Sequence, residues 1–339
     1  REQTISYCDT ADGEIHRTKL RHQHDDVRAF YEQFTGEVIV GFEASGYSAW
    51  FEQMLAELKH TVWLGNAAEI RRKAPRRQKN DRRDAALMLD LMLKGEFPRV
   101  YTFSAESRTV LRQLRYRHKL VKVRTMAKNS LQAIAINAGL PLKRGLLTQT
   151  GMEKLKALPL PPELSDQRDE WLELITLLNE RIATLEEALQ QRTQDDAQIA
   201  LLRSHPGIGL LTALALRYTL LPLSRFRSTR AVTAYVGFDC IEDQSGERRR
   251  LGSISKAGSR LLRFLLNEAG QTAARRDPEL KRFYQRLRHR RDRPKAKVAV
   301  ARKLLVRSFI MLRDQIDYAE FVRRGVAARV ARKAHSLND

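Results

Sequence analysis

Short blocks of hydrophobic and polar positions follow one another along the first hundred residues and predict strands and helices in turn. Residues 3–8 and 14–20 are typical of two strands around a "DTADGE" turn. "EVIVGF" predicts a buried strand that leads into a helix over "SAWFEQMLAELKH", and "TVWLGN" predicts a further strand before a helical segment. Because strands alternate with helices, we expect an α/β domain over residues 1–103.

The pattern is almost entirely helical over residues 104–198. Apolar residues there recur at alternating spacings of four and three across nearly three heptads: Trp171, Ile175, Leu178, Ile182, Leu185 and Leu189. This seam predicts a helical hairpin or a coiled coil. Packing within the chain and self-association explain it equally well.

A third, mostly helical region is expected over residues 199–325, followed by a basic tail at 326–339. In "RSHPGIGLLTALAL", Gly207 and Gly209 form a turn between two apolar helical patterns. This composition is typical of a helix-hairpin-helix, in which glycines allow close backbone approach and helix N-terminal amides face a DNA phosphate. An ordinary αα-hairpin is the alternative.

Charge narrows the class of partner. The 339 residues carry a formal charge of +22 and a pI near 10.4, which indicates an anionic partner, nucleic acid first and an anionic membrane second. No apolar run approaches the roughly 20 residues that span a bilayer, and we see no secretory signal. Cys8 and Cys240 fit neither a disulfide framework nor a zinc site, so we expect a cytoplasmic, reducing setting.

The strongest basic excess lies between Arg275 and Arg313, where fifteen Lys or Arg face only three acids. Their helices have apolar opposite faces, so this stripe suits contacts with nucleic-acid phosphates. Such contacts weaken steeply with salt.

Three acids are candidates for a divalent-metal site. Glu43 lies at the end of a predicted buried strand, where α/β proteins place ligands. Asp81 and Asp84 are three residues apart at the start of a predicted helix and so share a face. Carboxylates are preferred ligands of Mg²⁺, and metal ions assist phosphoryl displacement. Capping and pairing with neighbouring arginines explain the two aspartates as well.

The stretch "EDQSGERRRLGSISKAG", residues 242–258, holds three serines and three consecutive arginines. Ser245 is either a nucleophile or part of a flexible phosphate-binding loop. Ser253 and Ser255 are candidates for helix capping or phosphate binding. The cations that we expect to hold phosphate here are Arg248, Arg249, Arg250 and Lys256.

Five segments in order resemble one family over nearly the whole chain, the DEDD transposases of bacterial insertion sequences, which are related to pilin-gene invertases. The matching segments are "GFEASGY", "KNDRRDA", "HPGIG", "AYVGFDCIEDQSGERRRLGSISKAG" and "LLRFLLNEA". The resemblance implies an RNase H-like (RuvC-like) N-terminal domain, a helical coiled-coil middle and a mostly helical C-terminal transposase domain.

The same resemblance implies four acids that bind Mg²⁺, of which Glu43, Asp81 and Asp84 match the second, third and fourth. We expect the first to precede Arg1, since Asp9 follows its strand. It also implies that Ser245 is the nucleophile that forms a covalent bond with DNA. Implied partners are donor and target double-stranded DNA, a structured guide RNA and further copies of the chain as a dimer or tetramer.

We therefore expect an enzyme, an RNA-guided DNA recombinase of an insertion sequence. Three alternatives remain open: a DNA invertase of the same family, a metal-dependent nuclease or junction resolvase without a covalent intermediate, and a non-enzymatic architectural DNA-binding protein. The last predicts that loss of all three acids is tolerated.

Overall fold

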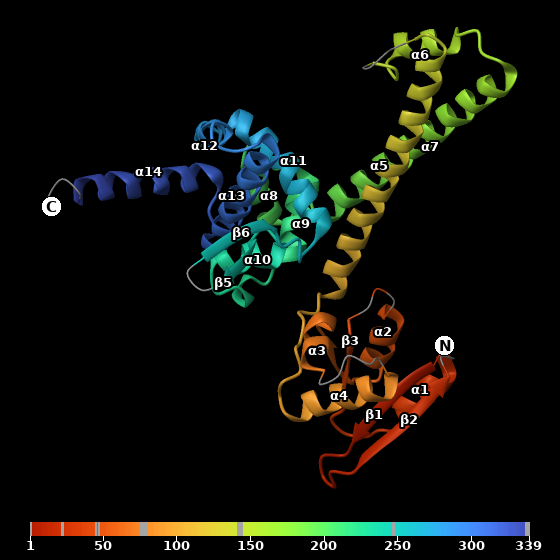
Figure 1. Ribbon diagram of the computed structural model, residues 1–339, viewed down its shortest axis with the longest axis vertical. Helices are drawn as coiled ribbons and strands as arrows, with labels where there is room; N and C mark the ends of the chain where they lie inside the picture. The colour runs from red at the N-terminus through yellow and green to blue at the C-terminus, as the bar shows by residue number, and fades with distance from the viewer. Residues whose placement is uncertain are drawn as a thin grey trace. The chain divides into compact units, whose positions relative to one another are not determined.

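A computed structural model describes residues 2–21, 24–44, 46, 48–74, 80–140, 145–245 and 248–335; within these, the side chains of 24, 243–245, 248–251 and 329–335 are left out. The chain divides into two compact units, Arg1–Phe103 and Ser104–Asp339 (Figure 1). None of the helices in the described ranges is long and apolar enough to cross a bilayer.

The first unit mixes strands and helices. Its elements are β1 (Glu2–Cys8), β2 (Ile15–Arg21), α1 (His24–Glu32), β3 (Ile39–Glu43), α2 (Ala49–Glu57), β4 (Thr61–Gly65), α3 (Ala67–Lys73) and α4 (Asp81–Leu93). β1 and β2 pair antiparallel, and β3 and β4 pair parallel. The strands and helices expected before residue 74 are confirmed.

Two apolar clusters hold this unit together. One joins α1 and α2, and Val40 and Phe42 of β3 pack against it; its buried residues are Val27, Tyr31, Phe51, Met54 and Leu55. The other joins α3 and α4 through Ile70 and Leu91, together with Phe97 after α4. Because α4 also packs against β1 and β3, its N-terminal turn is carried on a rigid element of the unit.

The second unit is mostly helical. Its elements are α5 (Ala105–Asn137), α6 (Gln149–Lys156), α7 (Pro162–Arg192), α8 (Ala197–Arg203), α9 (Leu210–Leu220), the 3₁₀ turn η1 (Leu223–Arg225), α10 (Thr229–Val236), β5 (Cys240–Ser245), β6 (Arg248–Ile254), α11 (Arg260–Arg276), α12 (Pro278–Arg288), α13 (Arg293–Asp314) and α14 (Tyr318–His335). The expected boundary at residue 325 lies inside α14.

Helices α5 and α7 pack along each other as an antiparallel pair (Figure 1). Arg117 and Glu186 form an ion pair of 2.6 Å, and Arg124 donates a hydrogen bond of 2.8 Å to Asn179. The expected seam of α7 is buried at Ile175, Leu178, Ile182 and Leu189. The seam therefore packs within the chain, as a helical hairpin.

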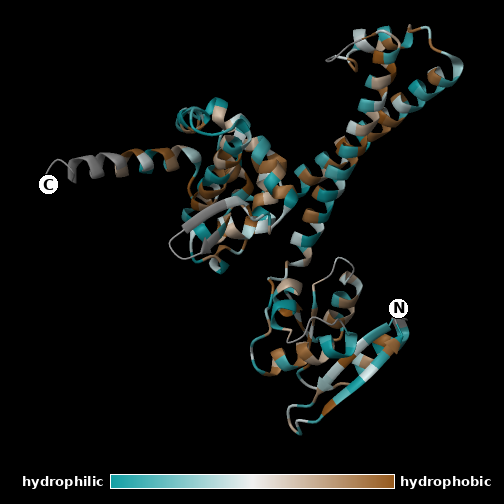
Figure 2. Ribbon diagram, viewed as in Figure 1, coloured by the Kyte–Doolittle hydropathy of each residue, from teal (hydrophilic) through white to brown (hydrophobic). Residues whose placement is uncertain are grey.

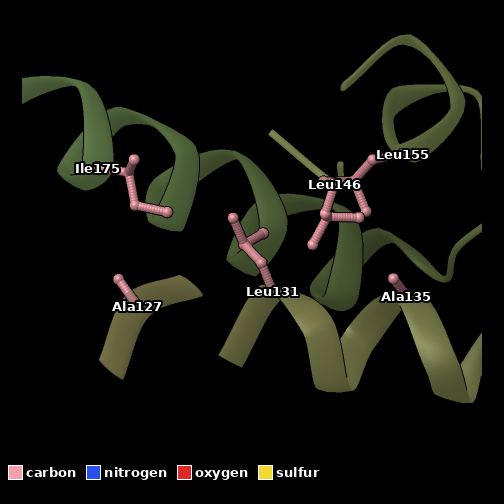
Figure 3. Packing of buried hydrophobic residues seen from close by; sticks show 6 residues of the cluster. All are labelled: Ala127, Leu131, Ala135, Leu146, Leu155 and Ile175. Atoms are coloured by element: carbon pink, nitrogen blue, oxygen red, sulfur yellow. The ribbon is translucent and has the colours of Figure 1, made fainter. Parts of the chain in front are cut away.

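The far end of this hairpin has its own core, to which α5, α6 and α7 contribute. Figure 3 shows Ala127, Leu131 and Ala135 of α5 turned toward Leu146, Leu155 and Ile175. All six side chains are aliphatic, and five of them are exposed by 4% or less. This packing stabilises the tip of a pair of helices that are each more than 30 residues long.

The C-terminal helices build the main core of the second unit around α9. Eight of the eleven residues of α9 are buried, and a helix that is apolar on all sides belongs inside a protein. It packs against α5, α8 and α11, and α11 in turn packs on α13. Figure 2 shows hydrophobic residues gathered where these helices meet. The β5–β6 hairpin lies beside this helical body in the second unit (Figure 1).

Candidate catalytic and nucleic-acid-binding site

Ser245 ends strand β5 of an antiparallel β-hairpin. It pairs with Arg248, and the next pairs along the hairpin are Gln244 with Arg249 and Asp243 with Arg250. The side chains of Ser245 and the three arginines lie outside the described residues. The backbone nevertheless brings the serine and all three arginines together on one element.

The expectation of a flexible loop over residues 242–258 is wrong for residues 242–245 and 248–254, which belong to strands. Backbone hydrogen bonds between the two strands replace hydration, so a segment with a low apolar content can still form a hairpin. The low hydrophobicity of the segment had hidden these strands.

The base of the hairpin is fixed to the end of α10. The Ser255 amide donates a hydrogen bond of 2.8 Å to the Asp239 carbonyl, and its hydroxyl donates one of 2.5 Å to the Asp239 carboxylate. Gly237 ends α10 with φ +78°, and a Cβ there would lie 2.5 Å from the Ala257 nitrogen. Only glycine fits this position.

Lys256 lies where the hairpin leads into α11. It is exposed and adopts φ +57°, a left-handed conformation that non-glycine residues seldom adopt. The cap of α11 is Ser259, whose hydroxyl accepts a hydrogen bond from the Leu262 amide. The capping role expected for Ser253 or Ser255 therefore belongs to Ser259, and Ser255 instead holds the hairpin.

The three candidate acids lie in the first unit. Glu43 is exposed at the end of β3, Asp81 is exposed at the first position of α4, and Asp84 is half-buried in the same turn. Asn80 caps this helix by accepting a hydrogen bond from the Arg82 amide. In the described part of the chain, no ion pair or side-chain hydrogen bond engages the three carboxylates. The cap of this helix is therefore Asn80 and neither aspartate, while the neighbouring Arg76 and Arg77 lie outside the described residues.

The donor set suits a hard divalent cation, because all three groups are carboxylates. Asp81 and Asp84 share one helical turn whose N-terminus favours negative charge. Yet among the described residues no three His, Cys, Asp or Glu side chains converge as metal ligands. The chemistry of the donors fits a divalent metal, while the expected cluster with Glu43 is not assembled here.

The two glycines of the α8–α9 turn differ in their surroundings. Gly207 has φ +101°, and a Cβ there would lie 2.6 Å from the Ala273 nitrogen and 2.8 Å from the Ala269 oxygen of α11. Gly209 is the exposed N-cap of α9, and no described atom lies within 4 Å of its Cβ position. Packing thus accounts for Gly207, and Gly209 is the glycine whose backbone is open to a ligand.

A buried polar network that the sequence did not reveal ties this turn to the C-terminal helices. Arg307 contacts Asp277 and Glu279 at 2.6 Å each, and the Tyr318 hydroxyl donates to Asp277 at 2.6 Å. Arg307 also lies 3.4 Å from the buried ring of His205. The only signal in the sequence was "DPEL", an N-cap aspartate followed by proline at the start of a helix.

The charge balance of Asp277 shows why the network is stable. Burial alone would raise the pKa of this carboxyl, but hydrogen bonds from the Tyr318 hydroxyl and the Leu280 amide, together with Arg307, outweigh burial and lower it. Asp277 therefore stays ionised beside a buried guanidinium. Removing either partner would leave an uncompensated buried charge.

Basic residues gather at the junction of α12 and α13. Residues 288–295 are all exposed and include Arg288, Arg290, Arg291, Arg293 and Lys295. Figure 2 shows this end of α12 as hydrophilic. The junction presents a dense positive charge suited to phosphate contacts.

Two family models match the chain. A model described as "Transposase", of the DEDD type, matches residues 1–135, and one described as "Transposase IS116/IS110/IS902 family" matches residues 199–285. The first model agrees with an RNase H-like N-terminal domain. The second covers the α8–α9 turn and the β5–β6 hairpin.

Curated relatives agree. A probable family 20 transposase of Pseudomonas aeruginosa is 30% identical over 301 residues, which are 84% of this chain and 88% of the relative. A putative transposase of Sinorhizobium fredii is 27% identical over 258 residues, 74% of this chain and 65% of the relative. The transposase of insertion sequence element IS1111A of Coxiella burnetii is 28% identical over 194 residues, 56% of this chain and 53% of the relative. The chain belongs to the IS116/IS110/IS902 family of transposases, enzymes that act on DNA.

Proposed function

We propose that this transposase cuts and rejoins DNA through a covalent bond between Ser245 and a DNA phosphate. The observation that supports this most strongly is the register of the β5–β6 hairpin, which sets Ser245 opposite Arg248 and places Arg249 and Arg250 next along the same strand. Guanidinium groups donate two parallel hydrogen bonds to phosphate oxygens and stabilise charge that develops during the reaction.

The proposed step is a phosphoryl transfer. The Ser245 hydroxyl oxygen attacks the phosphorus of a phosphodiester and releases its proton to solvent. The bond between phosphorus and one sugar oxygen breaks, and that oxygen takes up a proton as it leaves. A hydroxyl group of another DNA strand then attacks the phosphoserine, which restores the serine and joins the new strand.

Glu43, Asp81 and Asp84 are the residues that we propose hold Mg²⁺. Bound there, the ion would act as a Lewis acid on a phosphoryl oxygen. Among the described residues, no ion pair engages these three carboxylates, which leaves them available for this role. Asp81 and Asp84 hold their positions through the first turn of α4, which Asn80 caps.

We propose that the second unit contacts the phosphate backbone of the DNA. The exposed Gly209 amide at the N-terminus of α9 and the exposed ammonium of Lys256 are suited to phosphate oxygens, as in a helix-hairpin-helix. Gly207 supports the turn by packing on α11. These contacts position DNA and read no sequence.

The formal charge of +22 also supports binding of a second nucleic acid, and we extend the proposal to a guide RNA that pairs with donor and target DNA.

The acids and the serine belong to different units of the chain. Assembly of two or four copies would let one copy supply acids to the serine of another. An invertase reaction uses the same chemistry on a different arrangement of DNA sites.

The test compares Ser245→Ala with Ser253→Ala, a matched change at an exposed serine of β6. Ser245→Ala is expected to abolish both recombination and the covalent protein–DNA adduct, because alanine has no nucleophile. DNA affinity should stay within about twofold, since the phosphate-binding arginines remain. Denaturing gels of trapped reactions measure the adduct, and a joining assay measures recombination.

Two outcomes contradict the proposal. A Ser245→Ala protein that still recombines DNA excludes the serine as nucleophile. Metal-dependent cleavage without any adduct in the unsubstituted protein supports a nuclease that uses the acids alone. Ser253→Ala should form the adduct at the normal level.

A further inference from the structure

A groove runs along one face of α5, and the start of α11 forms its wall. Its lining includes His118, Lys122, Met126 and Asn129 of α5, and Arg260 and Phe264 of α11. The strand β6 ends at Ile254, and α11 begins at Arg260, so the wall of the groove follows directly after the hairpin that carries Ser245. The proposed chemistry does not use this surface.

The groove exposes apolar and aromatic side chains that no element of the described ranges covers. Met126 is 54% exposed and Phe264 is 45% exposed. The ring of His118 lies 4.8 Å from that of Phe264, so two ring systems from different helices meet in the groove. Exposed aromatic faces of this kind are platforms on which nucleic-acid bases stack.

Positive charge surrounds these rings. Burial, together with Lys122, Arg117 and Arg260, lowers the pKa of His118, which shows that cations are concentrated here. Arg117 is paired with Glu186 on α7. In the described part of the chain, no ion pair engages Lys122 or Arg260, which are both exposed. Two cations therefore remain available for an anionic occupant.

Polar groups complete the lining beside the rings. The hydroxyls of Thr125 and Ser130 donate to carbonyls of their own helix, and the exposed amide of Asn129 lies between them in sequence. An amide offers both a donor and acceptors for the edge of a base. The groove thus presents an aromatic face, a cation and an amide together, over about three turns of α5 and one of α11.

We propose that this groove holds a single-stranded segment of DNA, with a base stacked on Phe264 and phosphates bound by Lys122 and Arg260. The inference rests on the proposed function, because strand cutting and rejoining exposes unpaired bases next to the hairpin of Ser245. A duplex does not fit this chemistry as well, since its bases are already stacked on each other. A second copy of the chain is a poorer occupant of this groove, because the exposed cations Lys122 and Arg260 favour phosphates over the surface of a basic protein.

The experiment measures binding of a labelled single-stranded oligonucleotide, its duplex and the RNA of the same sequence. All variants are made in the full-length Ser245→Ala protein, so that binding is separated from chemistry. Phe264→Ala is expected to weaken single-strand binding roughly tenfold and to leave duplex binding unchanged. Tyr116→Ala is the matched control, because Tyr116 is an aromatic residue of α5, 52% exposed and outside the groove.

Two further measurements sharpen the assignment. A fluorescent adenine analogue in the strand should lose emission on binding, and Phe264→Leu, which keeps apolar volume, should remove that quenching. Changing both Lys122 and Arg260 to Gln should reduce the slope of log affinity against log salt by about 1.4, since each single-strand phosphate contact contributes about 0.7.

Several results would overturn the proposal. An equal loss of duplex binding in Phe264→Ala, or an equal loss in Tyr116→Ala, means that the ring is not a stacking platform. Tighter binding of the RNA than of the DNA, lost in Phe264→Ala, assigns the groove to RNA. A change in oligomeric state on gel filtration of Phe264→Ala assigns it to a second copy. Because every protein in this experiment carries Ser245→Ala, none of these results depends on the proposed covalent chemistry.

Discussion

At the scale of single residues, His205 shows how a buried group can be held in one protonation state. Its Nδ1 lies 3.0 Å from the Pro206 carbonyl oxygen, and its Nε2 lies 3.4 Å from Nη1 of Arg307. A carbonyl only accepts and a guanidinium only donates, so the neutral ring with its proton on Nδ1 satisfies both. Burial foremost, with help from Arg307, lowers the pKa of His205 to about 4.

This shift predicts a loss of stability as the pH falls. The unfolded chain binds a proton at His205 near pH 6.5, whereas the folded chain does so only near pH 4. The contribution is therefore complete above pH 6.5 and is lost as the pH falls toward 4, by about 3 kcal/mol in total. Denaturant unfolding at a series of pH values should show a shallower pH dependence for His205→Asn. His289→Asn, at an exposed histidine, should keep the original dependence; equal curves for all three proteins contradict the assignment.

Residue types were easier to predict than residue roles. The nucleophile candidate Ser245, the arginine run and the three acids were evident from their chemistry. The roles of Ser255 and Ser259 were not, because a hydroxyl can cap a helix or bind an aspartate, and which it does depends on backbone angles several residues away. The partners of Arg307 lie in the α8–α9 turn and at the start of α12, far from Arg307 in sequence, so no local pattern announced them.

At the scale of elements, the α8–α9 turn separates a structural glycine from an exposed one. Gly207→Ala should destabilise the protein by about 3 kcal/mol, because the methyl group meets the backbone of α11 at a positive φ. Gly209→Ala has open space and should change stability by less than about 1 kcal/mol. If the Gly209 backbone lies against a phosphate, the added methyl group should hinder that close approach and weaken DNA binding, while Gly207→Ala mainly lowers the unfolding midpoint.

Thermal unfolding and DNA titration of both variants check this separation. A Gly207→Ala protein with normal stability contradicts the close approach to α11. A Gly209→Ala protein with unchanged DNA affinity would show that the turn is an ordinary αα-hairpin.

Elements with strong periodicity were predictable, and the β5–β6 hairpin was not. The seam of α7 repeats over six positions, and its burial follows from that repeat. What covers the seam did not follow, because the same stripe suits α5 or a second copy. In the hairpin, Asp243 and Arg250 face each other across strands, and that complementarity appears only once the register is known.

At the scale of the whole molecule, function depends on residues that lie far apart in sequence. Helical spacing is local, so it placed Asp81 and Asp84 on one turn of α4. Bringing Glu43 to them depends on tertiary packing, and in the described ranges no cluster of three ligands forms. The net charge, by contrast, is independent of arrangement, and it was enough to indicate nucleic acid before any fold was known.

That charge predicts how DNA affinity depends on salt. Arg290 and Arg291 at the α12–α13 junction are exposed, and no ion pair is found for them among the described residues. Changing both to Gln should weaken duplex binding and reduce the slope of log affinity against log salt by about 1.8, because each duplex phosphate contact contributes about 0.9. The matched control changes Arg323 and Arg324 to Gln, which Glu320 already binds at 2.5 and 2.7 Å.

The control pair is expected to reduce the slope by less, since the single carboxylate of Glu320 already offsets one of the two positive charges of Arg323 and Arg324. Equal reductions in both double variants would mean that the net charge acts as a whole and that the junction is no special contact. An unchanged slope in the junction variant would place the duplex elsewhere on the protein. A reduction confined to the junction would show that duplex DNA lies across the end of the α12–α13 pair, on the same unit as Ser245.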